Sequence, residues 1–259
     1  MSDVVFYVGA HTDDALLFRG EGVFTDLHTP DVKTVQIVLT ADDAGRTDGW
    51  WEGHEAACIE SMAGTLTPVT PRSAEVTVNG HSIQRYTGPT WAYYALRLPD
   101  GNVTGEGFPS TDGRTLGKLQ SGVISSLAAI DKSTTYDGWD DLVTTLRGIV
   151  SSQRGTTARP WVNTSDHDRA LNPDDHPDHY AGADAVLEFA ADEGLDRLWW
   201  VSYDIRDRPA NLTGRAHDVK WFLFHLYGWK TDELIDTPPN EEEWGWWGAR
   251  SYARTEEGG

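Results

Sequence analysis

Two apolar runs near the start of the chain predict the first strands of a sheet. Val4–Gly9 (VVFYVG) and Val32–Thr40 (VKTVQIVLT) are rich in β-branched residues, as expected for strands buried on both faces of a parallel sheet. The segments that follow them, from Asp13 to about Phe18 and from Glu52 to Ala63, are predicted to be helices. The order strand, helix, strand, helix predicts an α/β fold.

The middle of the chain has a different pattern. Ala74–Tyr86 alternates around Asn79-Gly80, a dipeptide typical of a tight hairpin turn. Trp91–Leu98 predicts a further strand, whereas residues 99–138 are rich in Gly, Thr, Ser and Asp and predict a long surface loop. A loop of this length in a compact domain often covers a site. Trp139–Ser152 predicts a helix.

The last third of the chain returns to alternating strands and helices. The pattern predicts a strand over 160–163, a helix over 177–191 and a buried strand over 198–203 (LWWVSY). Trp199-Trp200 lies within this last strand and is expected to belong to the core. From Thr237 onward the pattern predicts no element.

No repeat, low-complexity tract or Pro/Gly/Ser linker divides the chain. Residues 1–259 are therefore predicted to form one Rossmann-like α/β domain, a mostly parallel sheet flanked by helices. We expect the β-hairpin and the long loop to form an insertion around 74–138, and the Trp-rich tail to form a C-terminal extension around 237–259.

Composition narrows the class of protein. A net charge of −20 repels phosphate backbones and anionic lipids, so nucleic acid is not expected as a partner. The simplest explanation of this charge is solubility or adaptation to high salt. No apolar stretch approaches the roughly 20 residues of a membrane span. Cys58 is the single cysteine, which excludes an intramolecular disulfide, and the start of the chain lacks the basic and apolar regions of a secretory signal. These features favour a cytoplasmic protein, with a homo-oligomer possible.

Two polar clusters interrupt the apolar pattern. His11, Asp13 and Asp14 follow the first predicted strand, at the edge where open α/β sheets bind ligands. His176 and His179 lie three residues apart at a predicted helix start, a spacing that places both imidazoles on one side. Two histidines and one carboxylate, with a fourth position open, match the ligand set of a catalytic zinc. Alternatively, the Thr and Asp side chains of either cluster cap a helix.

The two clusters together resemble a known family. "AHTDD" at 10–14 is similar to the AHPDDE signature, and "HPDH" at 176–179 to the second motif, of the PIG-L/LmbE-like zinc-dependent de-N-acetylases. "VLTADDAG" at 38–45 is similar to the family's Thr-Arg-Gly-Glu-x-Gly turn in altered form. Members are single-domain Rossmann-like proteins that remove acetyl groups from N-acetylglucosamine units of glycolipids, thiol precursors and antibiotics.

The resemblance implies a role for each matching residue. It implies that His11, Asp14 and His179 bind one zinc ion per chain, that Asp13 is the general base, and that His176 is the acid or the oxyanion partner. A carboxylate adjacent to a ligand fits the role of base, because it can reach a metal-bound water without itself binding the metal.

Three positions depart from the family pattern. Thr12 replaces the signature proline, Ala15 its terminal glutamate, and Glu52 an arginine three residues before Glu55. None of these changes removes a predicted ligand, so they indicate an intact metal centre with an altered recognition surface.

Several other residues are weaker candidates. Asp175 or Asp178 could orient a histidine, although surface solvation explains either equally well. Trp50, Trp51 and the nearby Asp43 could line the pocket, with the tryptophans offering flat faces to a sugar ring. Among the remaining polar residues, Arg206, Arg208 and His217 could lie over the crevice, although a solvated loop is the simpler reading of that segment.

The leading hypothesis is metal-dependent hydrolysis of an N-acetyl or other N-acyl amide on an amino-sugar-containing small molecule, such as a specialised metabolite or its precursor. The expected partner is an acylated amino sugar or glycoside. One alternative is the same centre acting on a different amide or ester, and another is a glycan-binding protein without turnover. A two-metal phosphoesterase would need more ligands and more basic residues. The sequence leaves open whether the metal is zinc or iron.

Overall fold

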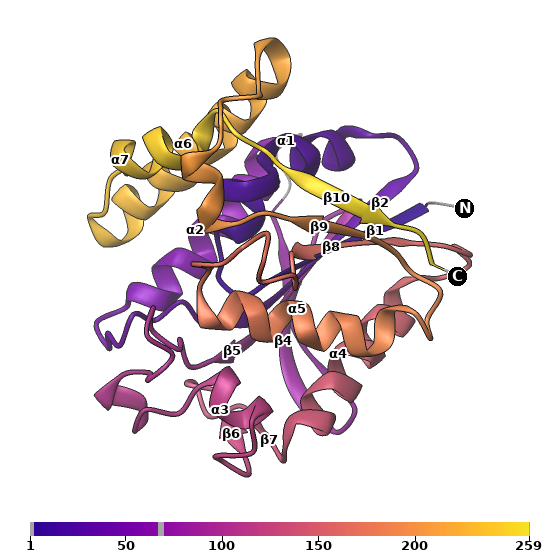
Figure 1. The fold of residues 1–259 in the computed structure, drawn as a ribbon, viewed down its shortest axis with the longest axis vertical. Coiled ribbons are helices and arrows are strands. Elements are labelled where there is room, and N and C mark those ends of the chain that lie inside the picture. Colours follow the sequence, from indigo (N-terminus) through magenta and orange to yellow (C-terminus); the bar gives the residue numbers. More distant parts are fainter. Residues whose placement is uncertain (1–2, 67–69, 259) are drawn as a thin grey trace.

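A computed structural model describes residues 3–66 and 70–258 as a mixed α/β fold around one large sheet (Figure 1). This confirms the predicted fold class. The sheet has eight strands in the order β10-β9-β8-β1-β2-β5-β4-β3. Their bounds are β1 (Asp3–Gly9), β2 (Val32–Thr40), β3 (Arg72–Val78), β4 (His81–Thr87), β5 (Trp91–Leu98), β8 (Trp161–Ser165), β9 (Asp196–Trp200) and β10 (Ala253–Glu256).

The central strands β9, β8, β1, β2 and β5 run parallel, whereas β10 pairs antiparallel with β9, and β4 pairs antiparallel with both β5 and β3. From β1 the chain first builds outward through β2 to β5, and later returns to add β8 and β9 on the other side. Strand order therefore reverses at β1. In sheets of this kind, ligands bind beyond the carboxyl ends of the strands at such a reversal.

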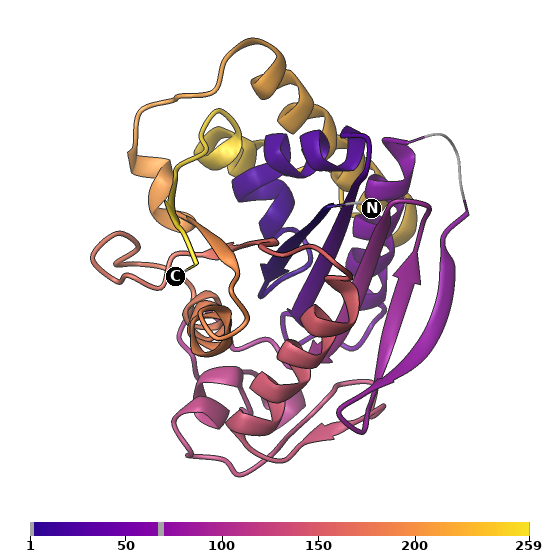
Figure 2. The same cartoon turned by 90° about the vertical axis from the view of Figure 1, so that its right-hand side faces the viewer.

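Helices cover both faces of the sheet (Figures 1 and 2). One core contains apolar side chains of α4 and α5, and the other contains those of α1, α2 and α6. The helices are α1 (Asp14–His28), α2 (Trp50–Gly64), α3 (Leu116–Gln120), α4 (Trp139–Gln153), α5 (Pro177–Ala190), α6 (Gly214–Ile235) and α7 (Glu241–Glu243). Within the described residues, no helix is long and apolar enough to cross a membrane.

The predicted hairpin is confirmed, with Asn79 and Gly80 at φ 50° and 84° in its turn. Positive φ at both positions is the geometry that an Asn-Gly turn favours. The hairpin strands β3 and β4 extend the main sheet through β5. The predicted loop over 99–138 also contains short elements, namely a 3₁₀ turn (Pro109–Thr111), α3, β6 (Leu127–Ala128) and β7 (Thr135–Tyr136).

Two predictions about the last third of the chain need correction. The strand predicted over 198–203 covers Asp196–Trp200, because Tyr203 already begins a 3₁₀ turn, Tyr203–Asp207. Trp199 and Trp200 are fully buried, as predicted. The tail, for which no element was predicted, forms α7, a π-helical turn (Trp244–Gly248) and β10, which pairs with β9.

Candidate metal centre

His179 meets His11 and Asp14 beyond the carboxyl end of β1, although it lies 165 positions from Asp14 in the sequence. His179 Nε2 lies 2.9 Å from Asp14 Oδ1 and 3.2 Å from His11 Nδ1, and His11 Nδ1 lies 3.5 Å from Asp14 Oδ1. All three residues are buried. Ligands about 2.0–2.1 Å from a tetrahedral zinc lie roughly 3.3 Å from one another. The three atoms therefore fit around one small cation.

The backbone of the β1–α1 connection orients Asp14. Its Oδ2 accepts hydrogen bonds from the N–H groups of Ala10 at 2.7 Å and His11 at 2.9 Å, so that Oδ1 is left for the cluster. Asp13 occupies the N-cap position of α1, but its side chain accepts no hydrogen bond from the helix. Helix capping, the alternative interpretation of this cluster, therefore does not explain the position of either carboxylate.

Asp175 orients His179 from the opposite side. Its Oδ1 accepts a 2.6 Å hydrogen bond from His179 Nδ1, and both side chains are fully buried. With the proton on Nδ1, the lone pair of His179 is on Nε2, which faces Asp14. A carboxylate partner on the far nitrogen is the usual support of a metal-binding histidine. The predicted orienting role thus has a direct contact at Asp175.

The buried carboxylates of the cluster are stabilised by positive charge. Burial alone would raise the pKa of Asp14, but His179 and His11 hold it well below the ordinary value. Burial alone would lower the pKa of His179, but Asp14 and Asp175 raise it to about 10. Protons on the imidazoles thus balance the carboxylates, and a divalent cation bound to the three ligand atoms would meet the same need.

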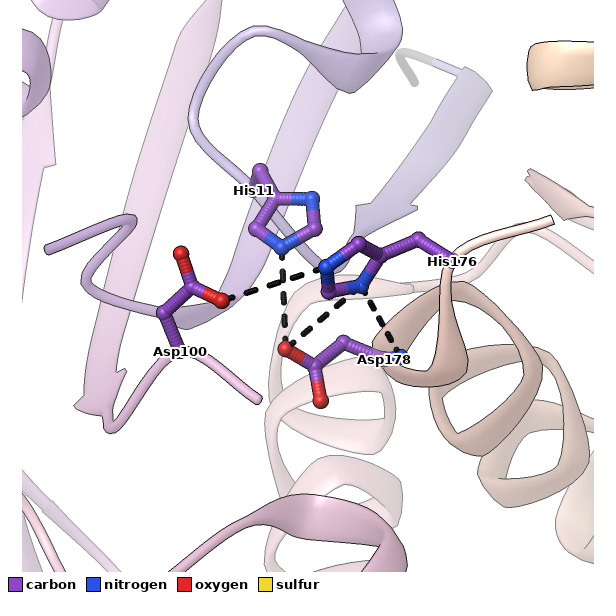
Figure 3. A group of neighbouring side chains, drawn as sticks. All are labelled: His11, Asp100, His176 and Asp178. Atoms are coloured by element: carbon purple, nitrogen blue, oxygen red, sulfur yellow. Dashed lines mark hydrogen bonds and ion pairs between the residues drawn. The ribbon is translucent and has the colours of Figure 1, made fainter. Parts of the chain in front are cut away.

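His11 also belongs to a second group, with Asp100, His176 and Asp178 (Figure 3). The tautomers argue against a second metal there. When His11 binds an ion through Nδ1, its Nε2 carries the proton, and this nitrogen lies 3.6 Å from Asp178 Oδ2. His176 Nδ1 accepts a 3.2 Å hydrogen bond from the Asp178 N–H, so its Nε2 also carries a proton. The second group is better described as a support for His11 and His176.

His176 is a neutral donor in this arrangement. Burial and the neighbouring His11 lower the pKa of His176 to about 3, which disfavours the imidazolium form. Its Nε2 lies 3.9 Å from Asp100 Oδ1. Asp178 does not cap α5, because its Oδ2 accepts a 2.7 Å hydrogen bond from the Gly101 N–H. A side chain at Gly101 would leave no room for this contact, since its Cβ would lie 2.5 Å from Asp178 Oδ1.

The cluster opens into a cavity of about 370 Å³. Its wall includes Asp13, which burial together with Asp42 and Asp14 gives a pKa well above the ordinary value. Among the weaker candidates, Trp50 also lines the cavity. The predicted ligands His11 and Asp14, the predicted base Asp13 and His176 therefore share one cavity.

Other candidates lie outside this cavity. Trp51 packs against the Arg97 guanidinium and lines a separate cavity together with Asp43. Asp43 has a supporting position instead, because its Oδ1 accepts a 2.9 Å hydrogen bond from the Asp100 N–H. Three other residues considered from the sequence, namely Arg206, Arg208 and His217, do not line the metal-centre cavity.

Sequence reasoning missed a polar network on the wall next to Asp13. Thr12, which stands where the family signature has proline, donates a 2.8 Å hydrogen bond to Asp42 Oδ2. Tyr227 Oη lies 2.7 Å from His54 Nδ1 and 3.3 Å from Thr12 Oγ1. The nearest sequence signal is the end of β2, because Asp42 follows this strand as His11 follows β1 and Asp100 follows β5. Tyr227 comes from α6, which was not predicted.

No protein-family model matches the chain, and no curated protein matches it in sequence. Solved structures do match its fold. The zinc-inhibited form of teicoplanin deacetylase Orf2 is 13% identical, with a TM-score of 0.51 over 90% of this chain and 85% of that one. A deacetylase–teicoplanin complex is also 13% identical, with a TM-score of 0.51 over 97% and 96% of the two chains. N,N'-diacetylchitobiose deacetylase from Pyrococcus horikoshii is 15% identical, with a TM-score of 0.50 over 99% and 85%.

Proposed function

We propose that the protein is a metal-dependent hydrolase that removes an acetyl group from the nitrogen of an amino-sugar-containing small molecule. One observation carries the proposal: a cluster of three convergent ligand atoms opens through His11 and Asp14 into a cavity that Asp13, a carboxylate free of capping bonds, and His176, a histidine N–H donor, also line. These are the parts that hydrolysis of an amide requires, namely a metal site, a base and a group that stabilises the oxyanion.

His11 Nδ1, Asp14 Oδ1 and His179 Nε2 would hold the ion, and zinc is the expected metal. When bound, such an ion acidifies a water molecule and polarises the amide carbonyl. Asp13 accepts the proton of the attacking water. The Nε2–H of His176 donates a hydrogen bond to the carbonyl oxygen as it gains negative charge. When the C–N bond breaks, the proton held by Asp13 passes to the amine, and acetate and the free amino sugar leave.

The fold comparisons agree with this chemistry. The matching structures are described as deacetylases, one of them in complex with teicoplanin and another acting on N,N'-diacetylchitobiose. At 13% to 15% identity they support the fold, and the residues of this chain must carry the rest of the proposal. The aromatic wall of the cavity, which includes Trp50, Tyr203 and Trp247, suits a sugar ring.

The test is metal analysis followed by an acetate-release screen over N-acetylated sugars, glycosides and antibiotic intermediates. Native protein, Asp13→Asn and the exposed control Asp31→Asn are compared after loading with zinc. We expect release by the native protein and the control, and a loss of at least about 100-fold in Asp13→Asn. Equal release by all three proteins would reject Asp13 as the base. Tight binding of an acylated glycoside without any release would favour a binding protein instead.

A further inference from the structure

The wall of the metal-centre cavity has an unusual charge. Besides Asp13 and Asp14, it contains the carboxylates of Asp42, Asp100 and Glu243, and within the described residues it contains no lysine or arginine. One divalent cation would balance two negative charges at the ligand atoms, and Asp42, whose pKa is lowered, would remain ionised on the same wall. An ionised carboxylate that binds no metal favours a ligand with positive charge.

Asp42 and Glu243 take no part in the proposed metal chemistry, yet the fold fixes both. Thr12 and His54 hold Asp42, and although burial opposes its ionisation, the hydrogen bond with His54 lowers its pKa. Glu243 lies on α7, which Asn240 caps by accepting hydrogen bonds from the N–H groups of Glu242 and Glu243.

The segment that carries Glu243 is packed closely against α6. Gly228 allows Pro239 to approach, since a Cβ at this glycine would lie 2.6 Å from Pro239 Cα.

Within the described residues, Glu243 forms no ion pair with a lysine or arginine. Burial and, after it, the charge of Asp42 raise the pKa of Glu243, so the two carboxylates repel each other when both are ionised. A cation between them would relieve this repulsion.

Another feature of the same wall points to a saccharide. Trp247 is only 6% exposed, lines the cavity, and its indole N–H has no acceptor among the described residues. A buried N–H without a partner is costly, and a hydroxyl or ring oxygen of a bound ligand would satisfy it. The aromatic rings of Trp50 and Tyr227 border the same cavity, and the Arg46 guanidinium already lies 4.0 Å from the centre of the Trp50 ring.

We propose that Asp42 and Glu243 are specificity-determining residues that select an acylated amino sugar carrying a second, free ammonium group. This inference rests on the proposed function and narrows its substrate class from acylated amino sugars to aminated saccharides. The acyl amide would face the metal ligands and Asp13, while the ammonium group would lie toward Asp42 and Glu243.

The test uses two matched ligands: a neutral N-acetylated disaccharide, and the same disaccharide with a free amine in place of the acetamide on its second ring. Dissociation constants are measured by calorimetry at pH 6 with the zinc-loaded Asp13→Asn chain, in which turnover is suppressed. kcat/KM for both ligands is measured with the zinc-loaded native chain. Glu243→Gln and Asp42→Asn are compared with Glu242→Gln, an exposed neighbour that does not line the cavity.

We expect the aminated disaccharide to bind about tenfold more tightly than the neutral one, and the preference to fall as salt is added. Glu243→Gln and Asp42→Asn should each reduce this preference several-fold, whereas Glu242→Gln should keep it. Equal affinity for the two ligands, no binding of either, or a preference that survives both substitutions would overturn the inference. Binding with the expected preference but no release of acetate by the native chain would contradict the proposed function alone.

Discussion

His179 donates a 2.6 Å hydrogen bond from Nδ1 to Oδ1 of Asp175, one helical turn earlier, and both side chains are fully buried. This contact fixes which nitrogen of His179 faces His11 and Asp14, the other two predicted ligands. Because α5 begins at Pro177, Asp175 lies just before the helix, and its side chain contacts His179 in the first turn. The geometry of the candidate metal centre thus depends on a residue outside its three predicted ligands.

Loss of the Asp175 carboxylate should weaken metal binding. We expect Asp175→Asn to reduce zinc affinity by about 10-fold and Asp175→Ala by up to about 100-fold, because His179 loses its fixed orientation and some basicity. Competition with a chromophoric chelator measures the affinity, and Asp174→Ala, at an exposed neighbour, is the control. Unchanged affinity in both Asp175 variants would show that the contact does not support the metal.

The sequence predicts the parts of this fold that depend on local pattern. The runs that form β1 and β2, the Asn79-Gly80 turn and the start of α5 at Pro177 all have short-range physical causes. By contrast, α6 was missed. Its buried face includes Lys220, His225 and Thr231, polar residues that hide the apolar period by which a helix is recognised.

The same distinction applies to the site. His11, Asp14 and His179 could be named from motifs at the ends of predicted elements. Asp42, His54, Tyr227 and Glu243 could not, because they meet only after α6 and the tail fold over the carboxyl edge of the sheet. No spacing in the sequence encodes such long-range contacts. The residues of this part of the cavity wall were therefore harder to predict than the three candidate ligands.

Gly228 should be essential for the docking of the tail on α6. A Cβ at this position would lie 2.6 Å from Pro239 Cα, a backbone atom that cannot rotate away. We expect Gly228→Ala to lower the free energy of unfolding by about 1–3 kcal/mol despite the better helix propensity of alanine. Gly245→Ala, where a Cβ would meet nothing within 4 Å, is the matched control in urea denaturation. Equal stability of the two variants would contradict the close packing.

Lys220 should make stability depend on pH. Burial lowers its pKa to about 7, whereas in the unfolded chain the pKa is about 10.4. Between these values the unfolded chain binds a proton that the folded chain has released, so the stability contributed at this site rises with pH. Below pH 7 both states are charged and the cost of burying the charge is fully present.

Lys220→Met removes this pH-dependent contribution to the free energy of unfolding. We compare the free energy of unfolding of the variant with that of the native protein at two pH values. The variant minus native difference should be about 2 kcal/mol more positive at pH 6.5 than at pH 9. The lost hydrogen bonds to the Trp247 and Arg250 carbonyls affect both pH values alike. Lys230→Met, at a partly exposed lysine, should show no such difference between the two pH values. A constant difference for Lys220→Met would mean that this lysine stays charged in the folded protein.

The Arg97–Glu55 pair lies beside the site and should be sensitive to the loss of one partner. Arg97 donates to both Glu55 oxygens, at 2.8 Å and 2.5 Å, and to Asp131 at 2.7 Å, while the Glu55 side chain is only 6% exposed. Arg97→Met would leave the Glu55 carboxylate buried without a counter-charge, with the Tyr86 hydroxyl as a remaining donor, which should reduce the free energy of unfolding by about 3–5 kcal/mol. Arg46→Met, at an exposed pair with Asp48, should change the free energy of unfolding far less.

Adding Glu55→Gln to Arg97→Met tests why the single variant loses stability. If the unpaired charge is the cause, neutralising Glu55 should restore part of the stability, because an amide is far less costly to bury than a carboxylate. If the packing of the arginine side chain is the cause, the double variant should be no more stable than Arg97→Met. Chemical denaturation of the native protein, both single variants and the double variant measures the coupling between the two residues.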